Sequence, residues 1–201
     1  MNRKNFLLNG TFSAFSLSAI GQVKSNENGT FSGGCETTND ILGPFYRNDA
    51  PLRQDLTFSG LKGNHISIQG RVLESDCTTP IENALVEIWH CDTEGTYDNE
   101  SENFLHRASW RSGKEGEYSF KTIIPGKYLN GQLYRPSHIH FRVSAKGTKE
   151  LISQIYFKGD PNIAEDPWAS QEMAQHRILE ISPGDIQSNL TINFDISLAS
   201  D

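Results

Sequence analysis

The sequence lacks closely spaced cysteine pairs, basic stripes and long apolar runs, and each absence argues against a class of protein. Its only cysteines are Cys35, Cys77 and Cys91, and no Cys-x-x-Cys pair is present, so no zinc site of the ribbon or finger kind is indicated. Its 18 lysines and arginines are outnumbered by 25 aspartates and glutamates, which gives a formal net charge of -7. No basic stripe interleaved with aromatic residues occurs, which argues against nucleic acid as a partner. No run of about 20 apolar residues is present, so no membrane span is expected.

The first 21 residues have the order of features that is typical of an export signal. A basic region at residues 2–4 precedes a moderately apolar run at residues 6–20, and Ala-Ile-Gly at residues 19–21 offers a cleavage site. Arg-Lys-Asn-Phe-Leu at residues 3–7 resembles a twin-arginine signal in which lysine replaces the second arginine. We therefore expect residues 1–21 to be an export signal that directs the protein to the periplasm or outside the cell. If the segment is instead an ordinary tail, the protein is cytoplasmic.

The three cysteines allow at most one internal disulfide, which an exported protein can keep. If strands at residues 66–73 and 84–91 pair as neighbours through their connecting loop, Cys77 lies at the loop end. Cys91 then lies at the far end of its strand, about 20 Å away. A disulfide needs Cα atoms within about 7 Å, so a Cys77–Cys91 bridge is disfavoured. A bridge from Cys35 to either of the other cysteines remains open.

Short strand-like segments separated by turn residues recur along the rest of the chain. They are expected at residues 66–73, 84–90, 118–124, 138–144, 151–157 and 190–198. Residues 92–116 are polar and loop-like, and residues 164–176 are expected to hold a short helix. The pattern predicts an all-β fold, an antiparallel β-sandwich of about six to eight strands with long loops and few short helices. We place this domain at residues 38–201, after a flexible polar linker at residues 22–37.

The segment at residues 138–144 alternates between polar and apolar side chains. His138, His140, Arg142 and Ser144 share one face, and Ile139, Phe141 and Val143 share the other. A half-buried strand with this pattern makes the two imidazoles converge, and imidazole suits iron, zinc and copper. His-x-His is a short motif, however, and two structural histidines on a sheet face would produce it as well.

Four short motifs in a fixed order turn this histidine pair into part of a larger pattern. They are Gly95-Thr96-Tyr97 after a strand ending in Trp89-His90, Pro125-Gly126-Lys127-Tyr128, Arg135-Pro136-Ser137-His138-Ile139-His140, and the segment from Leu151 to Asp160. In order and spacing they resemble the intradiol ring-cleavage dioxygenases, the family of protocatechuate 3,4-dioxygenase and catechol 1,2-dioxygenase. The resemblance runs from about residue 38, through Gly-Pro-Phe-Tyr at residues 43–46, to the last strand. The segment from Leu151 to Asp160 looks closest to the protocatechuate type.

The resemblance implies a non-haem Fe(III) held by Tyr97, Tyr128, His138 and His140. Each tyrosine alone would more simply be a surface or turn residue, so the assignment depends on the whole set. The implied reaction is cleavage of a catechol-type ring by O2 between its two hydroxyl carbons, giving a muconate-type dicarboxylic acid. The substrate is implied to displace the phenolate of Tyr128, which then takes up a proton. The partners expected are thus a small catechol and O2, and a homo-oligomer remains an option.

The resemblance also implies roles for residues that do not bind the metal. Arg135 is expected to lie over the substrate ring and to stabilise negative charge there; a surface ion pair is the alternative. Gln154 matches a polar residue near the family's active site, and Tyr46 either lines the cavity or packs against it. Trp89 and Trp110 are expected in the core. The remaining histidines lack a partner at ligand spacing and are expected to be structural or exposed: His65, His90, His106 and His176.

A second hypothesis is a non-enzymatic β-sandwich binding module of the transthyretin or carboxypeptidase-regulatory kind. The segments at residues 71–73, 80–84 and 117–120 also fit such modules. This hypothesis explains the strands but not the order of the two tyrosines and two histidines. The two hypotheses differ in colour, because tyrosinate–Fe(III) charge transfer would make the enzyme burgundy and the module would be colourless. The substrate stays open among catechol, protocatechuate, hydroxyquinol and larger phenolics.

Overall fold

The computed structural model describes residues 24–25, 31–32, 35–184 and 190–201. The chain divides into two units at residue 34. In the first, strands β1 (Lys24–Ser25) and β2 (Phe31–Ser32) pair antiparallel. The second unit, Cys35–Asp201, holds all the other elements. The expected export signal lies outside the described residues and stays a prediction.

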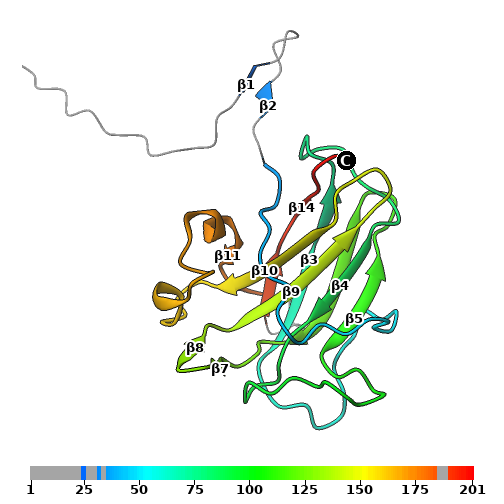
Figure 1. Ribbon diagram of the computed structural model, residues 1–201. Helices are drawn as coiled ribbons and strands as arrows, with labels where there is room; N and C mark the ends of the chain where they lie inside the picture. Colours follow the sequence, from blue (N-terminus) through cyan, green and yellow to red (C-terminus); the bar gives the residue numbers. More distant parts are fainter. Residues whose placement is uncertain (1–23, 26–30, 33–34, 185–189) are drawn as a thin grey trace, which may run out of the picture. The chain divides into compact units, whose positions relative to one another are not determined.

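The first of the two large sheets contains five strands in the order β11-β10-β9-β4-β5 (Figure 1). They are β4 (Leu85–Trp89), β5 (Arg107–Arg111), β9 (His138–Ser144), β10 (Leu151–Phe157) and β11 (Ile178–Leu179). All neighbours pair antiparallel except β10 and β11, which run parallel. Strand β9 is central, so its residues have neighbours on both sides.

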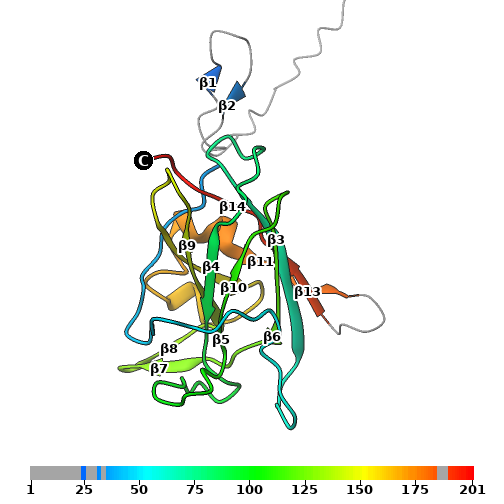
Figure 2. The same ribbon diagram turned by 90° about the vertical axis from the view of Figure 1, so that its right-hand side faces the viewer.

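The second large sheet is built around β3 (His65–Leu73), which pairs antiparallel with β6 (Glu117–Ile123). On its other side β3 pairs parallel with β13 (Leu190–Asn193) and β14 (Ile196–Ser197), and β12 (Ser182–Pro183) extends the sheet beyond β13. Viewed from the side, β3, β6 and β13 form a layer beside the one that contains β4, β9 and β10 (Figure 2).

The hydrophobic core lies between these two layers. Phe141 of β9 contacts the ring of Tyr118 from the other sheet at a centroid distance of 6.3 Å and that of Phe194 at 5.3 Å. Ile139 and Phe141 are fully buried in this core. The alternation read from residues 138–144 is therefore confirmed, and so is the all-β sandwich. Since one face of β9 fills the core, the other face is left to present the two histidines.

Short elements complete the fold at the ends of these strands. Strands β7 (Tyr128–Asn130) and β8 (Leu133–Arg135) form a two-stranded hairpin in which Tyr128 is the direct partner of Arg135. Two 3₁₀ helices, η1 (Ile163–Glu165) and η2 (Glu172–Arg177), follow β10. The short helix expected at residues 164–176 is confirmed in part, because the 3₁₀ helix η2 begins in this range and Pro167 lies between it and η1. In the part of the chain that the structure describes, no helix has the length and apolarity to cross a membrane.

The strands differ from the sequence-based expectations at three places. Residues 92–116, expected to be a loop, contain β5, whose Arg107-Ala-Ser-Trp-Arg sequence alternates but has only Ala108 and Trp110 as apolar residues. Strands β3 and β4, treated as possible neighbours, lie in different sheets. The last expected strand is interrupted between β13 and β14, where the Asp195 carboxylate accepts a hydrogen bond from the Arg71 backbone N–H at 2.8 Å. A side chain there replaces a backbone partner, which ends regular pairing.

The disulfide joins Cys35 to Cys77, whose Cα atoms are 6.2 Å apart. Cys91 is a buried free thiol. The prediction that Cys77 and Cys91 do not pair is therefore confirmed, although the two strands assumed in its derivation are not neighbours. The bridge connects the start of the domain to the loop that follows β3.

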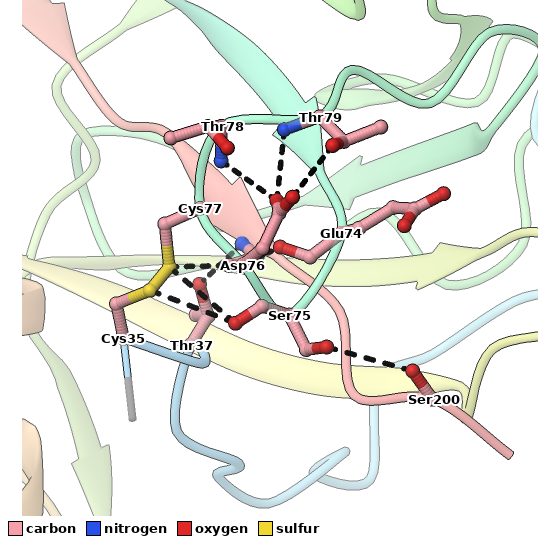
Figure 3. The surroundings of a disulfide bond; sticks show 10 residues. Cys35, Thr37, Glu74, Ser75, Asp76, Cys77, Thr78, Thr79 and Ser200 are labelled. Atoms are coloured by element: carbon pink, nitrogen blue, oxygen red, sulfur yellow. Dashed lines mark hydrogen bonds between the residues drawn. A yellow bond between two sulfur atoms is a disulfide. The ribbon is translucent and has the colours of Figure 1, made fainter. Parts of the chain in front are cut away.

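That loop is held in shape by Asp76 (Figure 3). The Asp76 carboxylate accepts hydrogen bonds from the backbone N–H groups of Thr78 and Thr79 and from the Thr79 hydroxyl, at 2.6 to 2.9 Å. Cys77 adopts a positive φ of 61° within this turn. These bonds hold Cys77 in place on its side of the bridge.

We expect replacement of Cys35 by serine to lower the free energy of unfolding by about 4 kcal/mol, because the bridge closes a loop of intermediate length in the unfolded chain. The sequence separation of the two cysteines is 42 residues. Urea unfolding of the variant and the wild type measures the difference. A reducing agent should lower the stability of the wild type by a similar amount and leave the variant unchanged. Equal stability of the variant and the oxidised wild type would contradict this expectation.

Candidate active site

Two loops that carry tyrosines lie backbone against backbone because each has a glycine at the contact. A Cβ on Gly95, which has φ of +85°, would lie 2.5 Å from the carbonyl oxygen of Lys127. A Cβ on Gly126 would approach the Thr93 carbonyl oxygen even more closely. Neither contact leaves room for a side chain, so the glycines permit the loops to meet. As a result, the rings of Tyr97 and Tyr128 lie edge to face with their centroids 5.7 Å apart.

The two histidines of β9 complete this cluster. His138 and His140 are buried, and their ring centroids are 5.0 Å apart. The Tyr97 hydroxyl lies 3.3 Å from Nε2 of His138, and the Tyr128 ring lies 5.7 Å from the His138 ring. The structure therefore brings together all four side chains that the sequence singled out as metal ligands.

The hydrogen bond on the far side of His138 sets its tautomer. Its Nδ1 lies 2.6 Å from the carbonyl oxygen of Pro136, which can only accept, so Nδ1 carries the proton. Nε2 is then left with a free lone pair beside Tyr97. A histidine that donates one ring N–H to a backbone carbonyl while the other nitrogen is free is the usual arrangement of a metal ligand.

His140 is held by two neighbours that the sequence did not connect with the site. The indole of Trp89 stacks on its ring at 4.7 Å, with only 8° between the planes. A Cβ on Gly43, which has φ of +72°, would come within 3.1 Å of Cε1 of His140, so the glycine keeps space open there. Nδ1 of His140 is buried without a hydrogen-bond partner among the described residues. Trp89 was expected in the core, and it is buried, but it also orients this imidazole.

Burial keeps Tyr97, His138 and His140 neutral in the absence of a cation. It raises the pKa of Tyr97 well above its ordinary value, with the nearby Cys91 adding to the effect. Burial, together with the charge of Arg135, lowers the pKa of His138 to about 4, and burial lowers that of His140 strongly as well. Neutral imidazoles offer lone pairs, and a bound cation would lower the pKa of a phenol and make it a phenolate. The donor set therefore fits a hard, highly charged ion such as Fe(III).

Other residue types do not offer a comparable site in the described part of the chain. No cluster of three or more His, Cys, Asp and Glu side chains suited to a metal ion is found there. A groove of about 740 Å³ lies over β3, β6 and β13 and shares no lining residue with the tyrosine and histidine cluster. His90 and His106 are buried together with their rings 5.0 Å apart, whereas His65 and His176 are exposed, which matches the structural or exposed roles expected.

Arg135 is buried at the base of the β7–β8 hairpin, directly opposite Tyr128. Its Nη2 donates to Oε1 of Gln154 and to the hydroxyl of Tyr156, both at 3.2 Å. Its Nε donates to the Asp166 carboxylate at 2.7 Å. The alternative of a surface ion pair is therefore wrong, because Arg135 is only 2% exposed. Sequence reasoning found Arg135 and Gln154 but missed Asp166, which lies in the segment interpreted as a helix.

Phe45 and Tyr46 of the Gly-Pro-Phe-Tyr segment pack against the cluster and against Trp89. Phe45 stacks on Tyr97 at 4.2 Å and meets Tyr128 edge-on at 5.7 Å. Tyr46 lies edge-on against Trp89 at 5.0 Å, and its hydroxyl donates to Glu87 at 2.9 Å. Of the two roles left open for Tyr46, packing is thus the one that the structure supports. Phe45 was not singled out from the sequence, although it contacts both tyrosines.

Comparison with known proteins finds relatives over most of this chain. The family model described as Dioxygenase matches residues 41–200. Catechol 1,2-dioxygenase 2 of Acinetobacter lwoffii is 37% identical over 150 residues, which is 65% of this chain and 54% of that protein. The protocatechuate 3,4-dioxygenase beta chain of Burkholderia cepacia is 34% identical over 166 residues, covering 72% of this chain and 70% of that one. The alignments thus span about half to two thirds of the curated relatives.

Solved structures agree with these matches. The dioxygenase domain of a dioxygenase–carbohydrate-binding fusion protein from Streptomyces sp. SirexAA-E superposes with a TM-score of 0.72 at 27% identity, covering 83% of this chain and 99% of that one. Catechol 1,2-dioxygenase of Acinetobacter sp. ADP1 gives a TM-score of 0.70 at 27% identity, covering 82% of this chain and 63% of that one. Both catechol and protocatechuate enzymes are among the relatives, so the expected closeness to the protocatechuate type stays a prediction. The chain belongs to the intradiol ring-cleavage dioxygenase family.

Proposed function

We propose that this protein is a ferric dioxygenase that cleaves a catechol-type ring between its two hydroxyl carbons with O2, giving a muconate-type dicarboxylic acid. The observation that carries the proposal is the convergence of Tyr97, Tyr128, His138 and His140 in one buried cluster. These four side chains would hold the metal. When bound, Fe(III) supplies a Lewis acid that binds the catechol oxygens and withdraws electron density from the ring.

The four residues would not act equally, because their surroundings differ. Tyr97 is only 6% exposed and is covered by Phe45, whereas Tyr128 is partly exposed at the start of the β7–β8 hairpin. Tyr128 is therefore the residue suited to move aside and to accept a catechol hydroxyl proton at its phenolate oxygen. His138 and His140 lie on a central strand and would keep their positions throughout.

Arg135 would act on the substrate rather than on the metal, and Gln154 would hold Arg135 in place. Arg135 keeps its charge at any working pH and is held rigidly, so it suits the stabilisation of negative charge on the ring. Gln154 accepts from Arg135 through Oε1, while its Nε2 donates to the Ile41 carbonyl at 2.8 Å. Membership of this enzyme family argues against the non-enzymatic binding module.

We also propose that the protein is exported and meets its substrate outside the cytoplasm. The Cys35–Cys77 disulfide supports this, because such bridges persist in oxidising compartments and are rare in the cytosol. The relatives include catechol, chlorocatechol, hydroxyquinol and protocatechuate dioxygenases. Which of these catechols this chain prefers is not fixed by the four-residue cluster, since all of them present the same pair of hydroxyls.

Purified protein is expected to bind about one Fe(III) per chain and to show a broad visible band from phenolate-to-iron charge transfer. Elemental analysis and the absorption spectrum test the metal. Oxygen uptake with a panel of catechol, protocatechuate, hydroxyquinol and larger phenolics tests the reaction, and mass analysis of the product tests where the ring opens. Protein that stays colourless and iron-free after loading with ferric iron would overturn the proposed function.

A further inference from the structure

Asp166 is a buried carboxylate beside the site, and it has no part in the function proposed above. Asp166 and Arg135 are about 1% and 2% exposed, and together they form a two-point ion pair. Nε of Arg135 donates to one carboxylate oxygen at 2.7 Å, and Nη2 donates to the other at 3.3 Å. Two parallel bonds of this kind fix the plane of a guanidinium group as well as its position.

Asp166 is itself immobilised by the turn that it begins. The carboxylate oxygen that faces Nη2 also accepts the backbone N–H of Trp168 at 3.0 Å and that of Ala169 at 2.7 Å. Burial alone would raise the pKa of Asp166, but the hydrogen bonds from Arg135 and Ala169 outweigh it and hold the pKa below its ordinary value. The carboxylate is therefore charged and has little freedom to turn.

Trp168 fixes the guanidinium from a third direction. The Arg135 guanidinium carbon lies 4.3 Å from the centroid of the indole ring. Nε and Nη2 have acceptors in Asp166, Gln154 and Tyr156, but Nη1 is buried with no hydrogen-bond partner among the described residues. A buried donor without an acceptor is costly, so Nη1 needs an acceptor from outside the described residues.

The charge of Asp166 shows what kind of role it has. A carboxylate next to a cation cancels part of the field that the cation exerts at a distance. Asp166 therefore cannot serve to strengthen the attraction of Arg135 for a developing negative charge. The ion pair instead fixes the orientation of the Arg135 guanidinium. A functional group whose neighbours are held in place keeps the geometry that a reaction needs.

We propose that Asp166 and Trp168 are positioning residues that hold the Arg135 guanidinium in one orientation and leave Nη1 as its donor to the bound catechol. The inference rests on the proposed function, because it takes a catechol as the ligand. It adds residues from the loop between η1 and η2, a part of the chain that contributes no metal ligand. Nothing is transferred to or from either residue.

The test compares Asp166→Asn with Tyr118→Phe in the iron-loaded enzyme. Tyr118 of β6 is buried between the two sheets, and its hydroxyl donates to the Phe194 carbonyl. Loss of a buried polar partner should lower the melting temperature in both variants. Only Asp166→Asn should lower kcat, by about 10²-fold, since a misplaced group costs that much. Its iron content, visible band, anaerobic affinity for catechol and KM should stay within about threefold of the wild type.

Trp168→Ala provides a second measurement that leaves the ion pair intact. It should lower kcat several-fold with iron and colour retained, while Trp168→Phe, which keeps an aromatic face, should restore most of the activity. Equal kcat losses in Asp166→Asn and Tyr118→Phe, or unchanged kcat in Asp166→Asn and Trp168→Ala, would show that Asp166 and Trp168 serve stability alone. If Asp166→Asn does not fold, the two Trp168 variants decide. Wild-type protein that cleaves no catechol overturns both proposals, whereas active wild type with these outcomes overturns only the positioning role.

Discussion

Alanine at His138 or His140 is expected to abolish iron retention, and with it the visible band and ring cleavage. Both imidazoles are buried on one face of β9 with their rings 5.0 Å apart, so no other side chain can take over their position. Loss of one of the four proposed ligands would leave a hard cation with two phenolates and a single imidazole. Elemental analysis after gel filtration, together with the absorption spectrum, measures the loss.

The control for this prediction is an alanine at His176, an exposed histidine on η2. It should keep iron, colour and activity, which separates loss of a ligand from loss of any histidine. Tyr128→Phe should retain part of the iron and shift the visible band, because Tyr128 is the more exposed of the two tyrosines. Equal iron content and identical spectra in His138→Ala, His140→Ala and Tyr128→Phe would rule out the ligand assignment.

Sequence-based prediction was most successful where the periodicity of side chains along a strand determines which residues share a face. Alternation along residues 138–144 was enough to place both histidines on one face and Ile139 and Phe141 in the core, because side chains on a strand alternate with period two. The meeting of Tyr97 with Tyr128 has no such local signal. It depends on backbone contact at Gly95 and Gly126, which the spacing of the two loops in sequence does not predict. Only the family resemblance linked them.

The parts that could not be predicted depend on long-range contacts. β5 is paired with β4 over five residues, yet its only apolar residues are Ala108 and Trp110, and Arg107 and Ser109 are buried by hydrogen bonds rather than by apolar packing. Gly43 approaches His140 from a segment almost a hundred residues away in sequence, so its role appears only when the chain is folded. Asp166 is the clearest case. An aspartate before a proline predicts a turn, and nothing near it in sequence indicates a buried arginine as its partner.

Arg135→Leu is expected to keep iron, colour and catechol binding while kcat falls by about 10² to 10³, or roughly 3–4 kcal/mol, the usual cost of losing one preorganised electrostatic contact. The guanidinium is buried and donates hydrogen bonds to Asp166, Gln154 and Tyr156, so its charge is held in place before the substrate arrives. Negative charge grows on the ring only as the reaction proceeds, which is why the loss should appear in kcat rather than in KM.

Steady-state kinetics of the Arg135 variant, alongside its iron content, separates this role from a structural one. Removing the arginine also leaves Asp166 as a buried carboxylate without its partner, so the melting temperature should fall. The double variant Arg135→Leu with Asp166→Asn removes that unpaired charge. It should recover part of the stability but none of the kcat, because the group that faces the substrate is still missing. Recovery of kcat together with stability would mean that Arg135 supports the fold and does not act on the ring.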